Sequence, residues 1–194
     1  MPGRPRSFEP SAALTQAMDV FWARGYEATG IAHLEVATGL GRQSLYGAFG
    51  DKRTLFAKVV EHYFDNVIKP ALIDVLDAPG SGRANIERVF AIWEAAALAD
   101  DFRGCLVGNG ISEVSSKDHA MAEVLVRKLT MLEAAFTRAI RRAQKDGEIN
   151  KGIDAKALAG ALVAISQGLS ITARVRHSRS QVRGVLEQAR RLLD

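Results

Sequence analysis

The segment from Thr29 to Phe56 constrains the fold of this chain more than any other. It reads TGIAHLEVATGLGRQSLYGAFGDKRTLF, with two short helical patterns on either side of Gly39-Leu40-Gly41. Asp51 and Lys52 then open a longer helical pattern. Two short helices joined by a glycine-containing turn form a helix-turn-helix, a motif that places its second helix in a DNA groove. The segment therefore predicts a small helical DNA-binding unit.

The second short helix, expected over residues 42–49, has two different sides. At about 100° per residue, Leu45, Ala48 and Phe49 fall on one side and should face a core. The opposite side has no acidic residue and can hydrogen-bond to bases and phosphates; it consists of Arg42, Gln43, Ser44, Tyr46 and Gly47. Gln suits adenine and Arg suits guanine. We therefore expect Gln43 and Arg42 to read bases, and Ser44 and Tyr46 to contact phosphates.

Gly47 is unusual inside a helix, where glycine costs about 1 kcal/mol relative to alanine. It falls at the centre of the outward side, beside Gln43. Our hypothesis is that it lets the helix backbone approach the bases closely.

The string GLGRQSLYGAFGDKRTLF, with the upstream GRPRSF, ALTQAMDVFWARGYEATG and HLEVAT, resembles the DNA-binding domain of the TetR/AcrR repressors. The pattern L-Y-x-x-F-x-x-K-x-x-L-F is a specific mark of that family. The chain departs from the family at Gly41, which stands where Ser, Thr or Asn often caps the recognition helix. It departs again at Gly30 and His33, near the start of the preceding helix. The resemblance implies a three-helix headpiece followed by a helical domain that binds a small molecule.

Residues around the motif are candidates for phosphate contacts. Thr29 is a good N-cap for the first of the two short helices, and its hydroxyl could also bond a phosphate. Lys52, on the first turn of the next helix, is either a solvated side chain or, within this motif, a phosphate contact that fixes orientation without reading sequence. Arg4 and Arg6 lie between prolines in a short arm, which is either a frayed terminus or an arm laid along the minor groove.

Helical spacing continues through the rest of the chain, so we expect an all-α protein of about nine helices. The first helix should start at Pro10 and stop at Gly25. Asp51, Asp154 and Ser180 are the expected N-caps of later helices, and Pro70 should kink or break the helix that contains it. We expect a headpiece over residues 1–50, arm included, and a ligand-binding and dimerisation domain over residues 51–194.

The composition sets limits on location and partners. The chain has 194 residues, 47% of them hydrophobic, and a single cysteine, which favours the reducing cytoplasm. No apolar run approaches the roughly 20 residues that span a bilayer, and we expect no membrane association. The charge of +4 is uneven, because residues 172–194 hold 6 basic and 2 acidic residues. That basic segment needs its own explanation.

The resemblance implies an apolar cavity for a small apolar or amphipathic effector, although no residue motif identifies the ligand. Any one aromatic residue or Met at helical spacing is more often a core residue than a cavity residue. The candidates for the cavity wall are Phe64, Phe90, Trp93, Cys105, Asn109, Met121 and Phe136.

Two C-terminal helices are expected to form a homodimer. One, over residues 154–175, is rich in small residues that allow close helix approach, and the other, over residues 180–193, has an apolar stripe. The expected interface residues are Leu162, Ile165, Leu169, Val182, Val185, Leu186 and Ala189. A two-fold dimer would bind a near-palindromic operator with half-sites roughly 34–36 Å apart or a little more.

The sequence shows no arrangement of residues suited to catalysis or metal binding. The four histidines are scattered without a paired ligand spacing, and the glycine-dense segment 103–110 lacks the order of a phosphate-binding loop. Cys105 is either a small buried hydrophobe or a redox-sensitive thiol. We therefore predict no enzyme, cofactor or metal. The expected function is a ligand-released repressor; the alternatives are an activator without a ligand, or an all-α enzyme or binding module with a vestigial helix-turn-helix.

Overall fold

The computed structural model describes residues 8–114, 118–175 and 178–194. Within these residues every regular element is a helix, and the helices form nine continuous rods. In chain order they are α1 (Pro10–Arg24), α2 (Ile31–Thr38), α3 (Arg42–Phe49), the rod α4 (Lys52–Tyr63), η1 (Phe64–Ile73) and α5 (Asp74–Asp77), α6 (Gly82–Ala97), α7 (Leu106–Val114), α8 (His119–Lys145), α9 (Ala155–Thr172) and α10 (Arg179–Arg191). The prediction of an all-α chain with about nine helices is confirmed.

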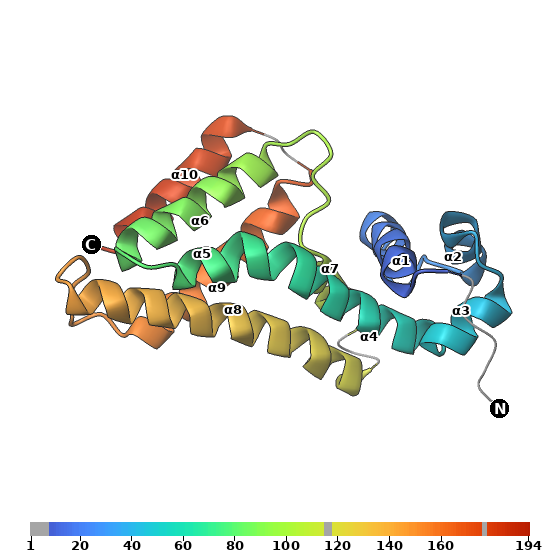
Figure 1. The fold of residues 1–194 in the computed structure, drawn as a ribbon. Coiled ribbons are helices and arrows are strands. Elements are labelled where there is room, and N and C mark those ends of the chain that lie inside the picture. Colours follow the sequence, from blue (N-terminus) through green and yellow to red (C-terminus); the bar gives the residue numbers. More distant parts are fainter. Residues whose placement is uncertain (1–7, 115–117, 176–177) are drawn as a thin grey trace, which may run out of the picture.

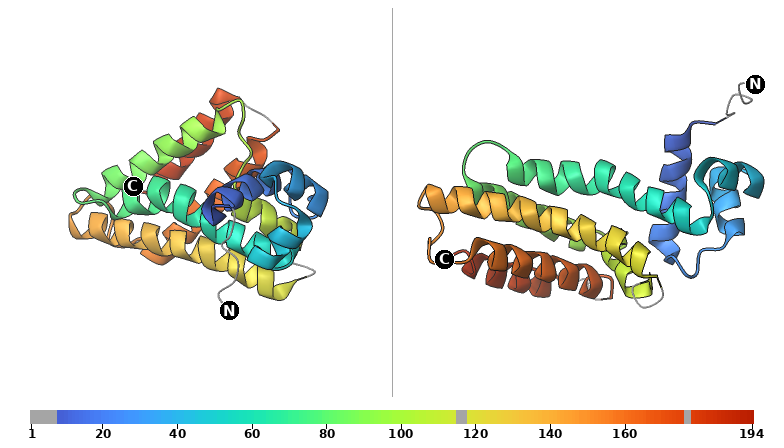
Figure 2. Two further views of the ribbon diagram at one scale, coloured as in Figure 1. Left: turned by 45° about the vertical axis from the view of Figure 1, so that its right-hand side comes forward. Right: turned by 90° about the horizontal axis from the view of Figure 1, so that it is seen from below.

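The helices form a small headpiece and a larger body. Helices α1, α2 and α3 lie together at one end of the molecule, and the rod that begins with α4 runs from them into the body (Figure 1). Helix α8 lies alongside this rod in both views of Figure 2. The rod therefore joins headpiece and body mechanically.

Buried side chains form two clusters, one at each end of the rod. Along the rod the clusters meet between Tyr63 and Phe64. The headpiece cluster also contains Leu106, Val114 and Met121, which come from α7 and α8. The core of the headpiece is thus completed by two helices of the body.

The helix ends follow local capping chemistry, and most of the predicted ends are confirmed. Helix α1 starts at Pro10 and stops at Gly25, whose φ of 85° suits glycine. Asp51 caps α4 by accepting from the Thr54 N–H at 2.8 Å, and Asp154 caps α9. These caps supply partners for N–H groups that a helix leaves unpaired.

Two predicted caps are wrong. The N-cap of α10 is Ser178, and Ser180 is already inside the helix. The N-cap of α2 is Gly30, whose N–H donates to Nδ1 of His33 at 3.0 Å. His33 thus performs a task that an acidic side chain at this helical position usually performs.

Pro70 was expected to kink or break its helix, and it does not break it. It lies inside η1, a stretch with the wider π-helical hydrogen bonding, and the rod continues into α5. Proline lacks an N–H and its ring crowds the carbonyl of the preceding turn, so an ordinary α-turn could not hold it. Locally wider winding accommodates the proline without ending the rod.

Five of the seven predicted dimer residues face the interior of the protomer, so that part of the prediction is wrong. They belong to the core of the body and are at most 5% exposed: Leu162, Leu169, Val182, Leu186 and Ala189. Ile165 is half-buried, and Val185 is 39% exposed. The apolar stripes of both helices point inward because α9 packs on α8 and α6, and α10 packs on α6 and α9.

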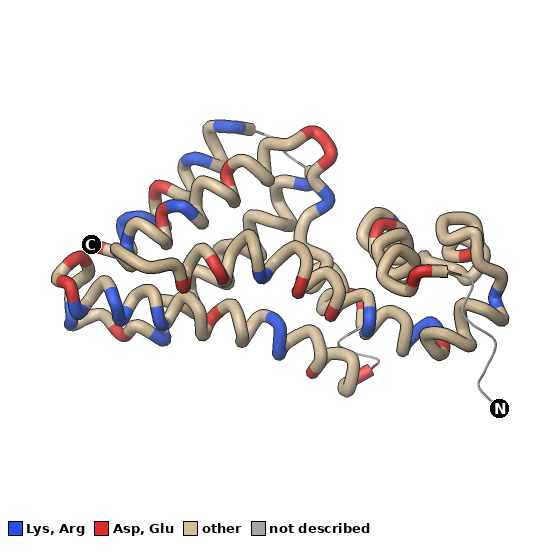
Figure 3. The backbone as a smooth tube through the Cα atoms, in the orientation of Figure 1, with Lys and Arg blue, Asp and Glu red and all other residues tan. Residues whose placement is uncertain are grey.

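The basic C-terminal segment is matched by acidic residues on α6. Nε of Arg183 donates to Glu94 at 2.7 Å, and Nε of Arg190 donates to Glu87 at 2.8 Å. Figure 3 shows basic residues on α10 next to acidic ones on α6. The hydrogen bond from Arg183 holds the pKa of Glu94 below its ordinary value. These arginines fasten α10 to the body.

Candidate nucleic-acid interface and cavity

Helix α3 presents the predicted polar side to solvent. Its exposed residues are Arg42, Gln43, Ser44 and Gly47, and Tyr46 is half-buried. Leu45 and Phe49 are 0% and 3% exposed and anchor the helix in the headpiece core. In Figure 3 basic residues lie on α3 and along α4. An exposed helix with polar and basic side chains fits the major groove of DNA.

The orientation of α3 depends on a residue of α2 that the sequence analysis did not single out. Gly41, the N-cap of α3, has no side chain to accept a hydrogen bond. Glu35 of α2 supplies the acceptor, because its Oε1 takes the Arg42 N–H at 2.6 Å. Gly39 allows the tight turn between the helices with a φ of 67°. The weak cap expected at Gly41 is thereby compensated.

Gly47 is not required by packing within the protein. A β-carbon added at this position would meet no atom of the chain within 4 Å. The helix around it is regular, so its backbone conformation does not require glycine either. Packing and backbone conformation within the protomer therefore give no reason for a glycine here, and the close approach to DNA stays a prediction.

Thr29 does not have the predicted roles. It is fully buried, and its hydroxyl donates to the carbonyl oxygen of Gly25 at 2.6 Å. It neither caps α2 nor reaches the surface, so its side chain is not placed to contact a phosphate. Its role is to close the turn between α1 and α2.

Lys52 is half-buried against that same turn. Its ammonium nitrogen lies 4.5 Å from the centre of the Tyr26 ring and 3.4 Å from the carbonyl oxygen of Glu27. The phosphate contact of Lys52 therefore stays a prediction. Arg4 and Arg6, the predicted minor-groove arm, lie outside the described residues.

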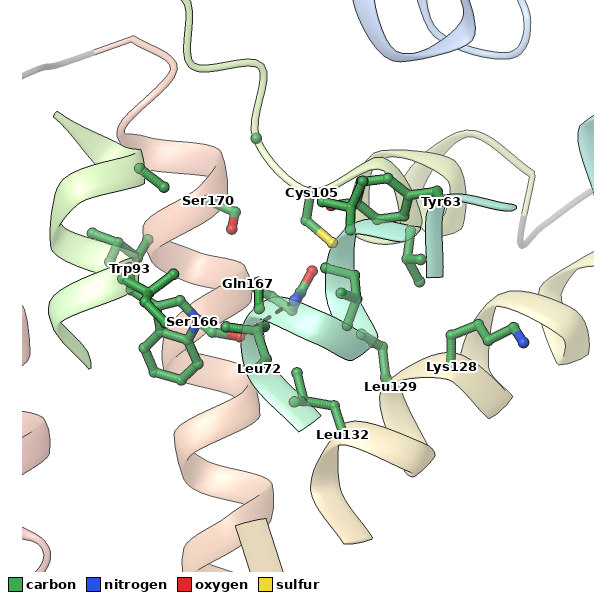
Figure 4. Close-up of a pocket in the computed structure, with 18 of the residues that line it drawn as sticks. Tyr63, Leu72, Trp93, Cys105, Lys128, Leu129, Leu132, Ser166, Gln167 and Ser170 are labelled. Carbon is green, nitrogen blue, oxygen red and sulfur yellow. Dashed lines mark hydrogen bonds between the residues drawn. The ribbon is translucent and has the colours of Figure 1, made fainter. Parts of the chain in front are cut away.

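A cavity of about 200 Å³ lies in the body, beneath the headpiece. Its walls come mainly from η1, α6, α8 and α9, and Trp22 of α1 and the loop before α7 also line it. Figure 4 shows the cavity with the side chains of Tyr63, Leu72, Trp93, Cys105, Lys128, Leu129, Leu132, Ser166, Gln167 and Ser170. Most of this wall is apolar, which suits a small apolar ligand.

Three of the seven predicted cavity residues line this space, and four do not. Phe64, Trp93 and Cys105 are part of the wall. Phe90 and Phe136 are fully buried in the body core, and Met121 belongs to the headpiece cluster. These were side chains at core-facing helix positions, which spacing alone cannot distinguish from cavity positions.

Asn109 is the fourth predicted residue that does not line the cavity, and its side chain instead forms hydrogen bonds within the protein. Its amide donates to the carbonyl oxygen of Arg103 at 3.1 Å and accepts from Arg174 at 3.3 Å. It therefore holds the loop before α7 against the end of α9. The sequence analysis missed Trp22, Lys128 and Gln167 in the cavity wall. They come from three separate helices, and no local pattern brings them together.

Several polar groups in the wall have hydrogen-bond or ion-pair partners. Tyr63 is buried, and this burial, above all, raises the pKa of its phenol well above the ordinary value. The ammonium of Lys128 forms an ion pair with Glu61 of α4 and lies 4.6 Å from the centre of the Phe64 ring. The carbonyl oxygen of the Gln167 amide is buried without a partner.

The cavity wall is connected directly to the headpiece. Trp22 of α1 lines the cavity, and its indole N–H donates to the carbonyl oxygen of Gly104 at 2.9 Å. Arg103, next to Gly104, donates to Asp19 of α1 at 3.1 Å and stacks over Trp22. A change in the loop before α7 would therefore act on α1.

A second connection lies at the start of α4. Arg53 forms a two-pronged ion pair with Asp118, the N-cap of α8. The hydrogen bonds from Arg53 hold the pKa of Asp118 well below its ordinary value. Glu113 of α7 also accepts from the Glu27 N–H at 2.9 Å. The headpiece thus contacts the body through α4, α7 and α8.

The sequence matches two family models. Residues 13–59 match "Bacterial regulatory proteins, tetR family", and residues 82–189 match "Tetracyclin repressor-like, C-terminal domain". Among curated proteins, the repressor ComR of Escherichia coli is 34% identical over 89% of this chain and 82% of its own length. The regulator YezE of Bacillus subtilis is 34% identical over 89% of this chain and 90% of its own length.

Solved structures agree with these matches. The TetR family regulator CifR, in a complex with double-stranded operator DNA, superposes with a TM-score of 0.86. It is 34% identical and the match covers 97% of this chain and 98% of that one. The reduced form of NemR from E. coli, 18% identical, has a TM-score of 0.80 and shares the fold.

Proposed function

The chain belongs to the TetR family and is therefore a DNA-binding transcriptional repressor rather than an enzyme, and we propose that it acts as a homodimer on a near-palindromic operator and leaves it when a small molecule fills the cavity. The observation that carries the DNA-binding part is the outer face of α3. Gln43 and Arg42 read base edges there, while Ser44 and Tyr46 contact phosphates. CifR, which was solved on operator DNA, supports the same use of this headpiece.

The dimer forms through the outward faces of α9 and α10. On α9 this face is an exposed stripe of small or apolar residues, spaced three or four positions apart. They are Ala157, Ala161, Ala164, Gly168 and Ile171. At α10 it includes Val185 of the helix and Leu192, its C-cap, which are 39% and 43% exposed. These residues replace the inward-facing ones that the sequence suggested.

The composition of α9 supports this face. Among the described residues, α9 is the one helix long and apolar enough to cross a membrane, and 39% of it is buried inside the protomer. A helix that is apolar on all sides needs cover on all sides. In this protein α8 covers one side, and a second copy of α9 covers the other.

Release from DNA begins in the cavity. A ligand there presses on η1, on Trp22 and on the loop that holds Gly104. Because η1 continues into α4, a shift of the rod moves the headpiece and changes the separation of the two α3 helices in the dimer. A ligand that prefers the shifted state weakens operator binding. The factor by which the ligand lowers the affinity for the operator equals the factor by which the operator lowers the affinity for the ligand.

We assign DNA recognition to residues 1–50 and effector binding and dimerisation to residues 51–194. The rod that carries the signal starts at Lys52, just after this boundary. The protein works in the cytoplasm, where bacterial DNA is found. We assign it no cofactor.

A gel shift with the DNA upstream of the protein's own coding region tests this function. We expect one shifted band at moderate salt, released by a protein-free extract of the cells that contain the effector. The matched control is a double variant, Arg42→Ala with Gln43→Ala, which should give no band. Absence of a band for the wild-type protein would refute the choice of operator and of α3 together, and a band resistant to every extract would refute ligand release.

A further inference from the structure

The cavity has a specific chemistry that defines the class of its ligand. Its wall is apolar except for a few polar groups, and several of these are already paired. The exception with the clearest geometry is Gln167 of α9, whose side-chain amide lies between Ser166 and Cys105 in Figure 4. The inference below rests on the proposed function, since it identifies the ligand of the same cavity.

The hydrogen bonds around Gln167 fix which end of its amide is free. The Ser166 hydroxyl donates to the carbonyl oxygen of Val163 at 2.7 Å, so its lone pair is left to accept. It accepts from Nε2 of Gln167 at 3.3 Å. The amide oxygen, Oε1, is then the buried atom without a partner, and it lies against Gly108 of α7. A buried oxygen that accepts no hydrogen bond destabilises the protein, and a ligand that donates to it removes this cost.

The charged group in the wall does not select an anion. Lys128 is 8% exposed, and its ammonium is paired with Glu61 of α4 and lies over the Phe64 ring. Figure 4 shows its nitrogen turned away from the Gln167 amide. An anionic ligand would have to break this pair and lose its own hydration, which is costly in an apolar wall.

The size of the cavity limits the ligand further. An apolar cavity of about 150 Å³ is large enough to hold benzene, and this one is about 200 Å³. Five aromatic side chains contribute to the wall, namely Trp22, Tyr63, Phe64, Trp93 and Phe102. Such a wall favours a single substituted aromatic ring.

We propose that the effector is a small uncharged molecule with an apolar body and one hydrogen-bond donor, of the class of the alkylphenols, and that the donor binds Oε1 of Gln167. Ser170, one helical turn further on the same face of α9, adds a hydroxyl to the same part of the wall.

Binding can be measured without DNA, because both tryptophans of the chain line the cavity. Tryptophan fluorescence, excited at the long-wavelength edge of the indole band, therefore reports occupancy. The probes are 4-methylphenol and p-xylene, which have nearly the same shape and differ by a hydroxyl in place of a methyl. A third probe, 4-methylbenzoate, tests an anion.

The key quantity is the ratio of the two dissociation constants, for p-xylene over 4-methylphenol. Replacing Gln167 with Leu should lower this ratio roughly fivefold, because it removes one hydrogen bond. Gln167→Met, which keeps the length of the side chain, should do the same and guards against a folding defect in the first variant. Gln16→Leu, the same change on the exposed side of α1, should leave the ratio as in the wild type.

An unchanged ratio in both Gln167 variants would overturn the proposal, as would tighter binding of 4-methylbenzoate than of 4-methylphenol. No fluorescence change with either neutral probe would also overturn it. The gel shift decides the proposed function separately: a protein that binds and leaves its operator but ignores the phenol keeps the function and loses this ligand class.

Discussion

The carboxylate of Glu35 accepts a hydrogen bond from the backbone N–H of Arg42 at 2.6 Å, so a residue of α2 caps α3. This contact sets the angle between α2 and α3 and keeps the first turn of α3 formed. It also places a negative charge beside a surface that must meet phosphates. The protein therefore uses one side chain for two opposing effects.

Substitutions at Glu35 separate these effects. Glu35→Ala should lower stability by about 1 kcal/mol, as the loss of a helix cap usually does, and the melting temperature by roughly 2–4 °C. Glu35→Gln keeps an acceptor and removes the charge, so it should keep the melting temperature and tighten binding to specific and random DNA alike. Equal melting temperatures for the wild type and Glu35→Ala would show that the cap contributes nothing.

Gly47→Ala tests the idea of close approach. The added methyl meets no atom of the protein within 4 Å, so the variant should be more stable by about 1 kcal/mol. Operator affinity should nevertheless fall, because the methyl lies on the surface that faces DNA. Thermal unfolding and fluorescence anisotropy on the same samples check both parts. A gain in stability with full operator affinity would contradict the hypothesis.

Gln43 and Lys52 should differ in how they affect binding. Gln43→Ala should cost about 1–3 kcal/mol at one operator position and relax the preference there, whereas Lys52→Ala should weaken all sequences and reduce the salt slope. Lys69→Ala is the control and should leave DNA binding unchanged. This lysine lies on the same rod, in η1, and pairs with Asp74. Identical losses on operator and random DNA for both test variants would mean that α3 reads no base through Gln43.

The dimer face can be tested with one charge. Ile171 is 56% exposed on α9, and Ile171→Glu should give monomers in sedimentation experiments. Operator affinity should drop about 100-fold or more, because two linked headpieces bind far better than one. Val126→Glu on α8, at a residue 49% exposed, is the matched control and should stay dimeric. Dimers of the Ile171 variant would place the interface elsewhere.

Asp118 should make the joint between α4 and α8 sensitive to acid. Its pKa is lowered in the folded protein, chiefly by hydrogen bonds from Arg53, so its contribution to stability is present above the ordinary range near pH 4 and is lost as the pH falls further. Asn keeps the helix cap but not the charge. The Asp118→Asn variant should therefore melt below the wild type at neutral pH, and the gap should narrow in acid. A constant gap would indicate that the charge of Asp118 is not involved.

The sequence alone predicted those structural features that depend on residues close together in the chain. Glycines at the turns, Asp51 and Asp154 at the caps, and the spacing of Leu45 and Phe49 identified the helix-turn-helix and most helix ends. These features depend on residues within one or two turns of each other, so periodicity and capping rules apply directly. The outward face of α3 followed from the same count.

Only the tertiary structure decided which apolar residues face what. Leu162 and Leu186 look the same in the sequence whether their stripe meets a partner or the protomer's own core, and the packing of α9 on α8 and α6, and of α10 on α6 and α9, turned them inward. The cavity depended on packing in the same way, since Trp22, Lys128 and Gln167 come from helices far apart in the chain. Helical periodicity determines which side chains share a face, but the partner of each face is set by contacts between distant segments. This is why the exposed face of α3 could be predicted from the sequence and the walls of the cavity could not.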